Sequence, residues 1–76
     1  MIKIYSTKAC VFCKKAKEFF DKNNIKYKEV DVVENENELR EMFQKSGQMG
    51  VPVIDVNGYI MSGYNEVKLK KLLGVK

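Results

Sequence analysis

An Asn-Gly dipeptide limits the possible folds of this chain more than any other feature of its sequence. Asn57-Gly58 follows the β-rich run Val51–Val56 and precedes a second short run, Tyr59–Met61. Asn-Gly between two such runs is the strongest short-range signal of a β-hairpin, because this pair accepts the backbone conformation of the tight turn. We therefore expect two antiparallel strands in this part of the chain.

The remainder of the chain alternates between strand-like and helix-like patterns. Residues 2–6 form a β-type run, and residues 25–32 alternate apolar and charged side chains, as strands with one buried face do. Apolar residues recur at spacings of three and four over residues 11–23, which predicts a helix. A second helix, capped by Asn35 or Asn37, is expected to reach about Lys45 and to end at Ser46-Gly47.

A third, short helix is expected to begin at Asn65 and Glu66 and to end at Gly74. The element order is then β-α-β-α-β-β-α, in which the first two strands are parallel and joined by a right-handed crossover. The predicted fold is a single α/β domain over residues 1–76, with a mixed four-stranded sheet and three helices. The expected core-facing residues of the last two helices are Leu39, Met42, Phe43, Val67, Leu69, Leu72 and Leu73.

Composition and charge narrow the class of protein. The chain is 45% hydrophobic and 32% charged, and its apolar runs fall far below the ~20 residues that span a bilayer. Without a signal-peptide pattern, we expect a cytoplasmic protein with no membrane partner. The net charge is +6 over residues 1–28, −4 over residues 29–46 and +2 over residues 47–76. Without an arginine cluster or RNA-binding motif, we interpret the early lysines as a solvated face rather than a nucleic-acid site.

The two cysteines carry the most specific chemical signal. Cys10 and Cys13 lie at the junction of the first strand and the first helix, where the partial positive charge and the unpaired N–H groups of a helix N-terminus stabilise a thiolate. Lys8, Lys14 and Lys15 are close in sequence and add positive charge. We expect Cys10 to be the more exposed nucleophile and Cys13, one turn further on, to be the resolving thiol, with both sulfurs within bonding reach.

The cysteine pair has two other interpretations. Cys-x-x-Cys can be half of a zinc site, but the chain has no histidine and no other cysteine, so two carboxylates would have to complete the site. Two inert buried cysteines are the second alternative. A redox pair that follows a strand is the favoured interpretation, and no metal ligand is assigned.

Several short motifs follow one another in the order and spacing of a known family. They are Tyr5, Cys10-Val11-Phe12-Cys13, Ala16-Lys17, Ser46-Gly47, Val51-Pro52, Asn57-Gly58 and Ser62-Gly63-Tyr64-Asn65. With these motifs the chain resembles a glutaredoxin from Ile2 to about Leu73. The resemblance implies the thioredoxin fold, in agreement with the element order.

The resemblance also implies a substrate-binding surface around the cysteines. The Val51–Pro52 peptide bond would be cis and face them, so that the Val51 backbone pairs with an extended thiol substrate; an ordinary trans proline at a strand start is the alternative. The run from Ser62 to Asn65 occupies the place where glutaredoxins receive the γ-glutamyl carboxylate of glutathione, or it is a plain turn and helix cap. Tyr5 and Tyr64 either flank the site or serve in packing. The implied binding residues are Lys8, Phe12, Gln48, Val51, Pro52, Gly63, Tyr64 and Asn65.

Departures from the family pattern reduce the affinity that we expect for glutathione. Val11 stands where proline is usual, Thr7 where lysine or arginine is frequent, and Asn65 where aspartate is usual. Val11, and Ser62-Gly63 followed by an aromatic residue, also resemble the redoxins that serve ribonucleotide reductase and accept electrons from thioredoxin reductase. Phe12 instead matches the glutaredoxins.

The expected function is that of a dithiol thiol–disulfide oxidoreductase. It would reduce protein disulfides or glutathione mixed disulfides through Cys10 and Cys13, as a monomer, with glutathione as co-substrate and no tightly bound cofactor. One alternative is a thioredoxin-reductase-dependent electron donor to ribonucleotide reductase. A second is a dimer that holds a [2Fe–2S] cluster through the Cys10 of each chain and two glutathiones.

Overall fold

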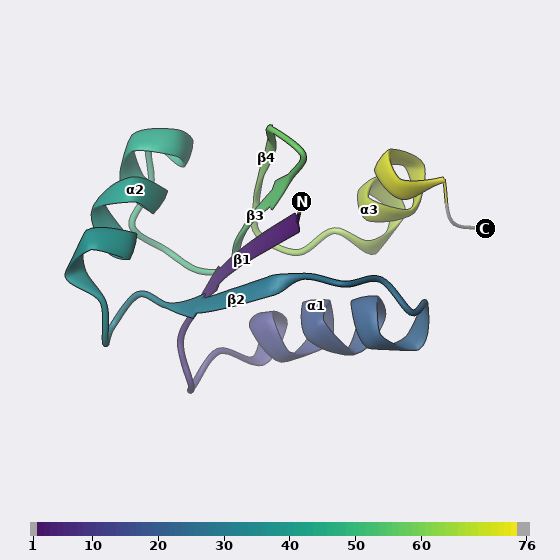
Figure 1. Ribbon diagram of the computed structural model, residues 1–76, viewed down its shortest axis with the longest axis horizontal. Coiled ribbons are helices and arrows are strands. Elements are labelled where there is room, and N and C mark those ends of the chain that lie inside the picture. Colours follow the sequence, from purple (N-terminus) through teal and green to yellow (C-terminus); the bar gives the residue numbers. More distant parts are fainter. Residues whose placement is uncertain (1, 75–76) are drawn as a thin grey trace.

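The order of secondary-structure elements is the one that the sequence predicts. The computed structural model describes residues 2–74 and contains a four-stranded sheet and three helices in the order β-α-β-α-β-β-α (Figure 1). The elements are β1 (Ile2–Ser6), α1 (Val11–Lys22), β2 (Lys28–Asp31), α2 (Glu36–Ser46), β3 (Val53–Val56), β4 (Tyr59–Ser62) and α3 (Glu66–Leu73). None of the helices in residues 2–74 is long and apolar enough to cross a membrane.

The sheet is mixed, with the strand order β2-β1-β3-β4. The central strand β1 pairs in parallel with β2 and antiparallel with β3, so that Ile4 lies between Glu29 and Ile54. The hairpin of β3 and β4 turns at Asn57-Gly58, where both residues have positive φ, 52° and 100°. The Asn-Gly prediction is therefore confirmed, and the mixed sheet with it.

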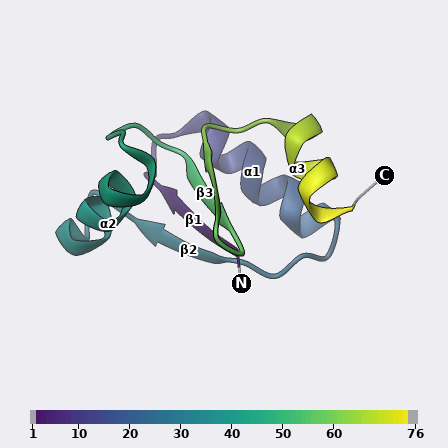
Figure 2. The ribbon, with the colours of Figure 1, turned by 90° about the horizontal axis from the view of Figure 1, so that it is seen from above.

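The helices cover both faces of this sheet, with α1 and α3 on one side and α2 on the other (Figure 2). Side chains alternate along a strand, so Ile4 and Ile54 face α1 and α3, while Tyr5 and Val53 face α2. The larger core consists of Ile2, Ile4, Ala16, Phe19, Phe20, Ile54, Val56, Met61 and Leu69. The smaller core consists of Tyr5, Val32, Met42 and Val53.

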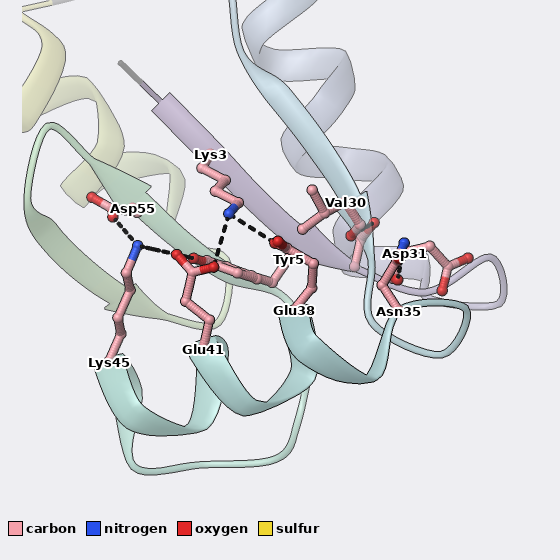
Figure 3. A network of polar contacts seen from close by, with 10 residues as sticks. Lys3, Tyr5, Val30, Asp31, Asn35, Glu38, Glu41, Lys45 and Asp55 are labelled. Atoms are coloured by element: carbon pink, nitrogen blue, oxygen red, sulfur yellow. Dashed lines mark hydrogen bonds and ion pairs between the residues drawn. The ribbon is translucent and has the colours of Figure 1, made fainter.

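A polar network fastens α2 to its face of the sheet (Figure 3). The Nζ of Lys45 lies 2.9 Å from the hydroxyl of Tyr5, 2.9 Å from the carboxylate of Glu41 and 2.9 Å from that of Asp55. The Tyr5 hydroxyl in turn donates to Glu41 over 2.9 Å, and Lys3 contacts the same carboxylate at 3.2 Å. Side chains from β1, α2 and β3 thus fix the position of α2.

Two strands are shorter than the sequence predicts. β2 begins at Lys28 rather than residue 25, because its parallel register pairs Lys28 with Lys3, near the start of β1. Ile25 still packs against the larger core, which explains why it follows the apolar pattern. β3 begins at Val53 rather than Val51, since the proline between them has no N–H to donate to a ladder.

The buried face of α2 is narrower than expected. Met42 is fully buried and Leu39 packs against the smaller core, but Phe43 is 49% exposed, so its assignment to the core was wrong. Phe43 lies one position beyond Met42, and a rotation of about 100° per residue carries its side chain off the stripe that contacts the sheet.

The same correction applies to α3. Leu69 is fully buried and Leu73 packs against the larger core, one turn further along the helix. Val67 and Leu72 are 64% and 37% exposed, contrary to the prediction. An eight-residue helix that packs on one face of the sheet presents one row of side chains to the core, and Leu69 and Leu73 occupy that row.

Candidate active site

Cys10 is the N-cap residue of α1. Its Sγ accepts a hydrogen bond from the backbone N–H of Cys13 over 3.1 Å, and its own N–H donates to the carbonyl of Thr7 over 3.3 Å. The loop after β1 therefore turns so that the sulfur lies at the first N–H groups of the helix. Partial positive charge at this end of a helix stabilises an anionic sulfur.

The two thiols differ in exposure as the sequence predicts. Both cysteines are free, Cys10 is partly exposed, and Cys13 is 1% exposed. Burial, together with the neighbouring Cys10 sulfur, raises the pKa of the Cys13 thiol from 9.0 to about 12. The accessible sulfur is therefore that of Cys10, and Cys13 stays protonated near neutral pH.

A charged pair lies close to the buried thiol. Lys17 follows Cys13 by one turn of α1, and its positive charge lowers the pKa of the Cys13 thiol, against the effect of burial. The Nζ of Lys17 lies 2.7 Å from a carboxylate oxygen of Glu29, and the hydroxyl of Ser6 donates to the same oxygen over 2.9 Å. The pKa of Glu29 is lowered, chiefly by this lysine, so the pair is ionised at neutral pH.

Glu29 and Ser6 are not among the site residues predicted from the sequence. Glu29 falls in a strand where charged residues alternate with apolar ones, a pattern that indicates a solvated face. Only the register of β1 and β2 brings its carboxylate to the end of β1 and to α1. These side chains, with Lys17 and Asp31, line a polar cavity of about 270 Å³ that also includes Thr7, the residue whose carbonyl accepts from Cys10.

The Val51–Pro52 peptide bond is cis, as the family resemblance implied. Pro52 is buried and Val51 is half-buried against the smaller core. The carbonyl of Pro52 accepts a hydrogen bond from the N–H of Gly63 over 2.8 Å, and Gly63 has a φ of 89°, which a residue with a Cβ rarely adopts. The loop before β3 is thereby joined to the end of β4.

Asn65 and Tyr64 have structural partners. The Oδ1 of Asn65 accepts the N–H of Lys68 over 3.1 Å and so caps α3. Tyr64 packs against the larger core, and burial raises the pKa of its hydroxyl. The turn-and-cap interpretation of this segment is therefore observed, and its role in binding glutathione stays a prediction.

Among the remaining predicted binding residues, Lys8 and Phe12 are exposed and Gln48 is half-buried. Lys8 is highly exposed and its Nζ is 3.8 Å from Glu34; the Gln48 amide donates to the carbonyl of Gly50 over 3.2 Å; the Phe12 side chain is 55% exposed. Of the two interpretations of Tyr5, packing is the one observed, because β1 directs its side chain to the α2 face, where it is fully buried.

The site combines a partly exposed thiol at a helix N-terminus, a buried thiol one turn later and a cis proline, on a mixed sheet of this strand order. These features define a thiol redoxin with the thioredoxin fold. The sequence profile of the glutaredoxin family matches residues 2–60, and the chain belongs to the glutaredoxin family.

Similar proteins agree with this assignment. The chain is 45% identical over 73 residues, 96% of its length, to an uncharacterized glutaredoxin-like 8.6 kDa protein in the rubredoxin operon of Clostridium pasteurianum, of which it covers 97%. Its structure matches that of a mutant of the thioredoxin-like protein BC3987 with a TM-score of 0.92 and 27% identity, covering 99% and 96% of the two chains. It matches a glutaredoxin from Archaeoglobus fulgidus with a TM-score of 0.85 and 26% identity, covering 95% and 84%.

Proposed function

We propose that this protein reduces disulfides in other proteins, or mixed disulfides between proteins and glutathione, through Cys10 and Cys13. The observation that carries the proposal is the hydrogen bond of 3.1 Å from the Cys13 N–H to the Cys10 Sγ. It joins an accessible sulfur at a helix N-terminus to the residue that holds a buried second thiol. This arrangement suits one thiol for attack on an external disulfide and the other for an internal second step.

The first step is attack by the Cys10 thiolate on one sulfur of the substrate disulfide. A Cys10–substrate disulfide forms, the substrate S–S bond breaks, and the other substrate sulfur leaves as a thiolate that solvent protonates. Because Cys10 is the exposed member of the pair, the substrate can reach it without unfolding of α1.

In the second step the Cys13 thiol loses its proton and attacks the Cys10 sulfur. The Cys10–Cys13 disulfide forms, the bond to the substrate breaks, and the substrate has gained two electrons and two protons in all. The high pKa of Cys13 opposes this step, and the positive charge of Lys17 favours it by lowering that pKa. The dithiol form is restored by two electrons from a reductant, for which we propose glutathione.

A pair of coupled assays tests this proposal and identifies the reductant. Oxidation of NADPH is followed with a disulfide substrate and this protein, once with glutathione and glutathione reductase and once with thioredoxin reductase. Turnover with glutathione supports a glutathione-dependent oxidoreductase. Turnover with thioredoxin reductase alone would mean that the reductant is thioredoxin reductase rather than glutathione. No turnover in either assay, from protein whose Cys10–Cys13 disulfide can form, would contradict the proposal.

A further inference from the structure

Two adjoining cavities run along the surface of α2. The inner cavity, of about 520 Å³, lies between Thr7, Val33 and Val51, and the outer one, of about 350 Å³, extends along α2 to Phe43. Both are lined by Glu36, Leu39 and Met49, so they form one continuous depression, which we call the α2 groove.

Large apolar side chains are exposed along the α2 groove. Val33 is 75% exposed, Met49 is 59% exposed and Phe43 is 49% exposed, and Leu39 between them is only half-buried. Apolar side chains gathered along one depression indicate a surface that another molecule covers, since burying them removes unfavourable contact with water.

The charges around the α2 groove favour an uncharged occupant. Glu36 is the one charged residue among the described residues that line the inner cavity. In the outer cavity Arg40 lies 3.0 Å from Glu36, so that the two charges offset each other. The Glu36 carboxylate of the inner cavity is the one paired with Arg40, so the described residues that line the groove offer no uncompensated charge, and apolar contact is left as the means of recognition.

The inner end of the α2 groove adjoins the redox site. Thr7 lines the groove, and its carbonyl accepts the N–H of Cys10 over 3.3 Å. Val51, at the same end, precedes the cis bond to Pro52. A chain whose cysteine is bonded to Cys10 therefore has the α2 groove as its adjacent surface.

The length of the groove sets the length of the segment that can occupy it. Glu36 and Phe43 are seven residues apart on α2. At 1.5 Å per residue of helix, this corresponds to about 10 Å, the length of about three residues of extended chain.

We propose that the α2 groove binds an extended, apolar segment of the partner protein, with bulky side chains within about three residues of the cysteine that Cys10 attacks. This inference rests on the proposed function and adds to it a preference for protein disulfides in apolar surroundings. Leucine, valine or phenylalanine beside the cysteine would contact Val33, Met49 and Phe43.

Two peptides that differ only beside their cysteine test this preference. Each carries one cysteine as a mixed disulfide with 2-mercaptoethanol, flanked by leucines in the first peptide and by serines in the second. The leucine peptide should be reduced with a kcat/KM about tenfold higher, as expected for burial of one large apolar side chain. Met49→Asp and Phe43→Asp should abolish the difference without slowing reduction of the serine peptide. Val67→Asp, at an equally exposed position on α3, should preserve it.

A binding measurement separates this inference from the proposed function. A leucine peptide with serine in place of cysteine should shift the backbone amide resonances of Val33, Leu39 and Phe43, but not that of Val67, even if the protein reduces neither disulfide peptide. Equal reduction of both peptides, with no such shifts, would overturn the α2 groove as a docking site while leaving the proposed function standing. Shifts of the same resonances on concentrating the protein alone would overturn it too, because a second copy would be the occupant.

Discussion

The N–H of Cys13 donates a hydrogen bond of 3.1 Å to the Sγ of Cys10. This contact joins a partly exposed residue to one that is 1% exposed, across a single turn of helix. The same N–H group that caps α1 through the Cys10 sulfur also favours negative charge on that sulfur. The contact that caps α1 therefore also places the Cys10 sulfur at the positive end of the helix.

Burial of Cys13 predicts a loss of stability at alkaline pH. Its pKa is raised to about 12 in the folded protein, from an ordinary value of 9.0. The contribution of the neutral buried thiol is complete below about pH 9 and is lost as the pH rises towards 12, because the unfolded state ionises first. Urea unfolding of the reduced protein should show this loss, and Cys13→Ser should show less of it. Parallel pH profiles for the two proteins would contradict the assignment.

Lys17 should accelerate the second step of the reaction. Its charge lowers the pKa of the Cys13 thiol, so Lys17→Met should raise that pKa. If the pKa of the Cys13 thiol rises by about one, the thiolate population falls about tenfold while the nucleophilicity of the thiolate increases about threefold, a net slowing of about threefold. Stopped-flow measurement of the release of substrate from a preformed Cys10 mixed disulfide gives this rate. Lys22→Met, further along α1, serves as the control, and equal rates for both variants would exclude the role of Lys17.

Glu41 should stabilise the protein above about pH 5. Its contacts with Lys45, Tyr5 and Lys3 lower the pKa of its carboxyl to about 2, from 4.5. A lowered pKa gives a contribution that is complete above the unfolded value and is lost as the pH falls towards 2. Glu41→Gln should cost about 1 kcal/mol at pH 6, given its exposure, and almost nothing at pH 2. Urea unfolding across this pH range measures the difference in the free energy of unfolding between wild type and the variant. The difference must decrease as the pH falls.

Neighbouring residues of α2 should differ strongly in their effect on folding. Met42 is fully buried beneath the helix, and its replacement by alanine should cost about 3 kcal/mol in the free energy of unfolding. Phe43 is 49% exposed, and Phe43→Ala should cost less than about 1 kcal/mol. Thermal or urea unfolding of both variants provides the comparison. A large loss for Phe43→Ala would mean that this side chain belongs to the core.

Features that depend on a few neighbouring residues could be predicted from the sequence. Asn57-Gly58 specified the hairpin, because the turn geometry depends on those two residues alone. Cys10 at the start of α1 followed from the change of pattern at that point, and the cis bond at Pro52 followed from the family resemblance.

Features that depend on strand register or on the rotation of a helix could not be predicted from the sequence. The pairing of Glu29 with Lys17 and Ser6 requires the alignment of β2 on β1, which sequence alternation alone does not give. The exposure of Phe43 beside the buried Met42 depends on which stripe of α2 meets the sheet. The α2 groove was missed for the same reason.

The roles of the two cysteines are tested most directly by trapping the first intermediate. Wild type, Cys13→Ser and Cys10→Ser are each mixed with an aromatic disulfide at neutral pH and examined by intact mass. Cys13→Ser should retain a stable mixed disulfide on Cys10, wild type should release the adduct and form the Cys10–Cys13 disulfide, and Cys10→Ser should react slowly. A rapid, stable adduct on Cys13 in the Cys10→Ser variant, with none on Cys10 in the Cys13→Ser variant, would contradict the account.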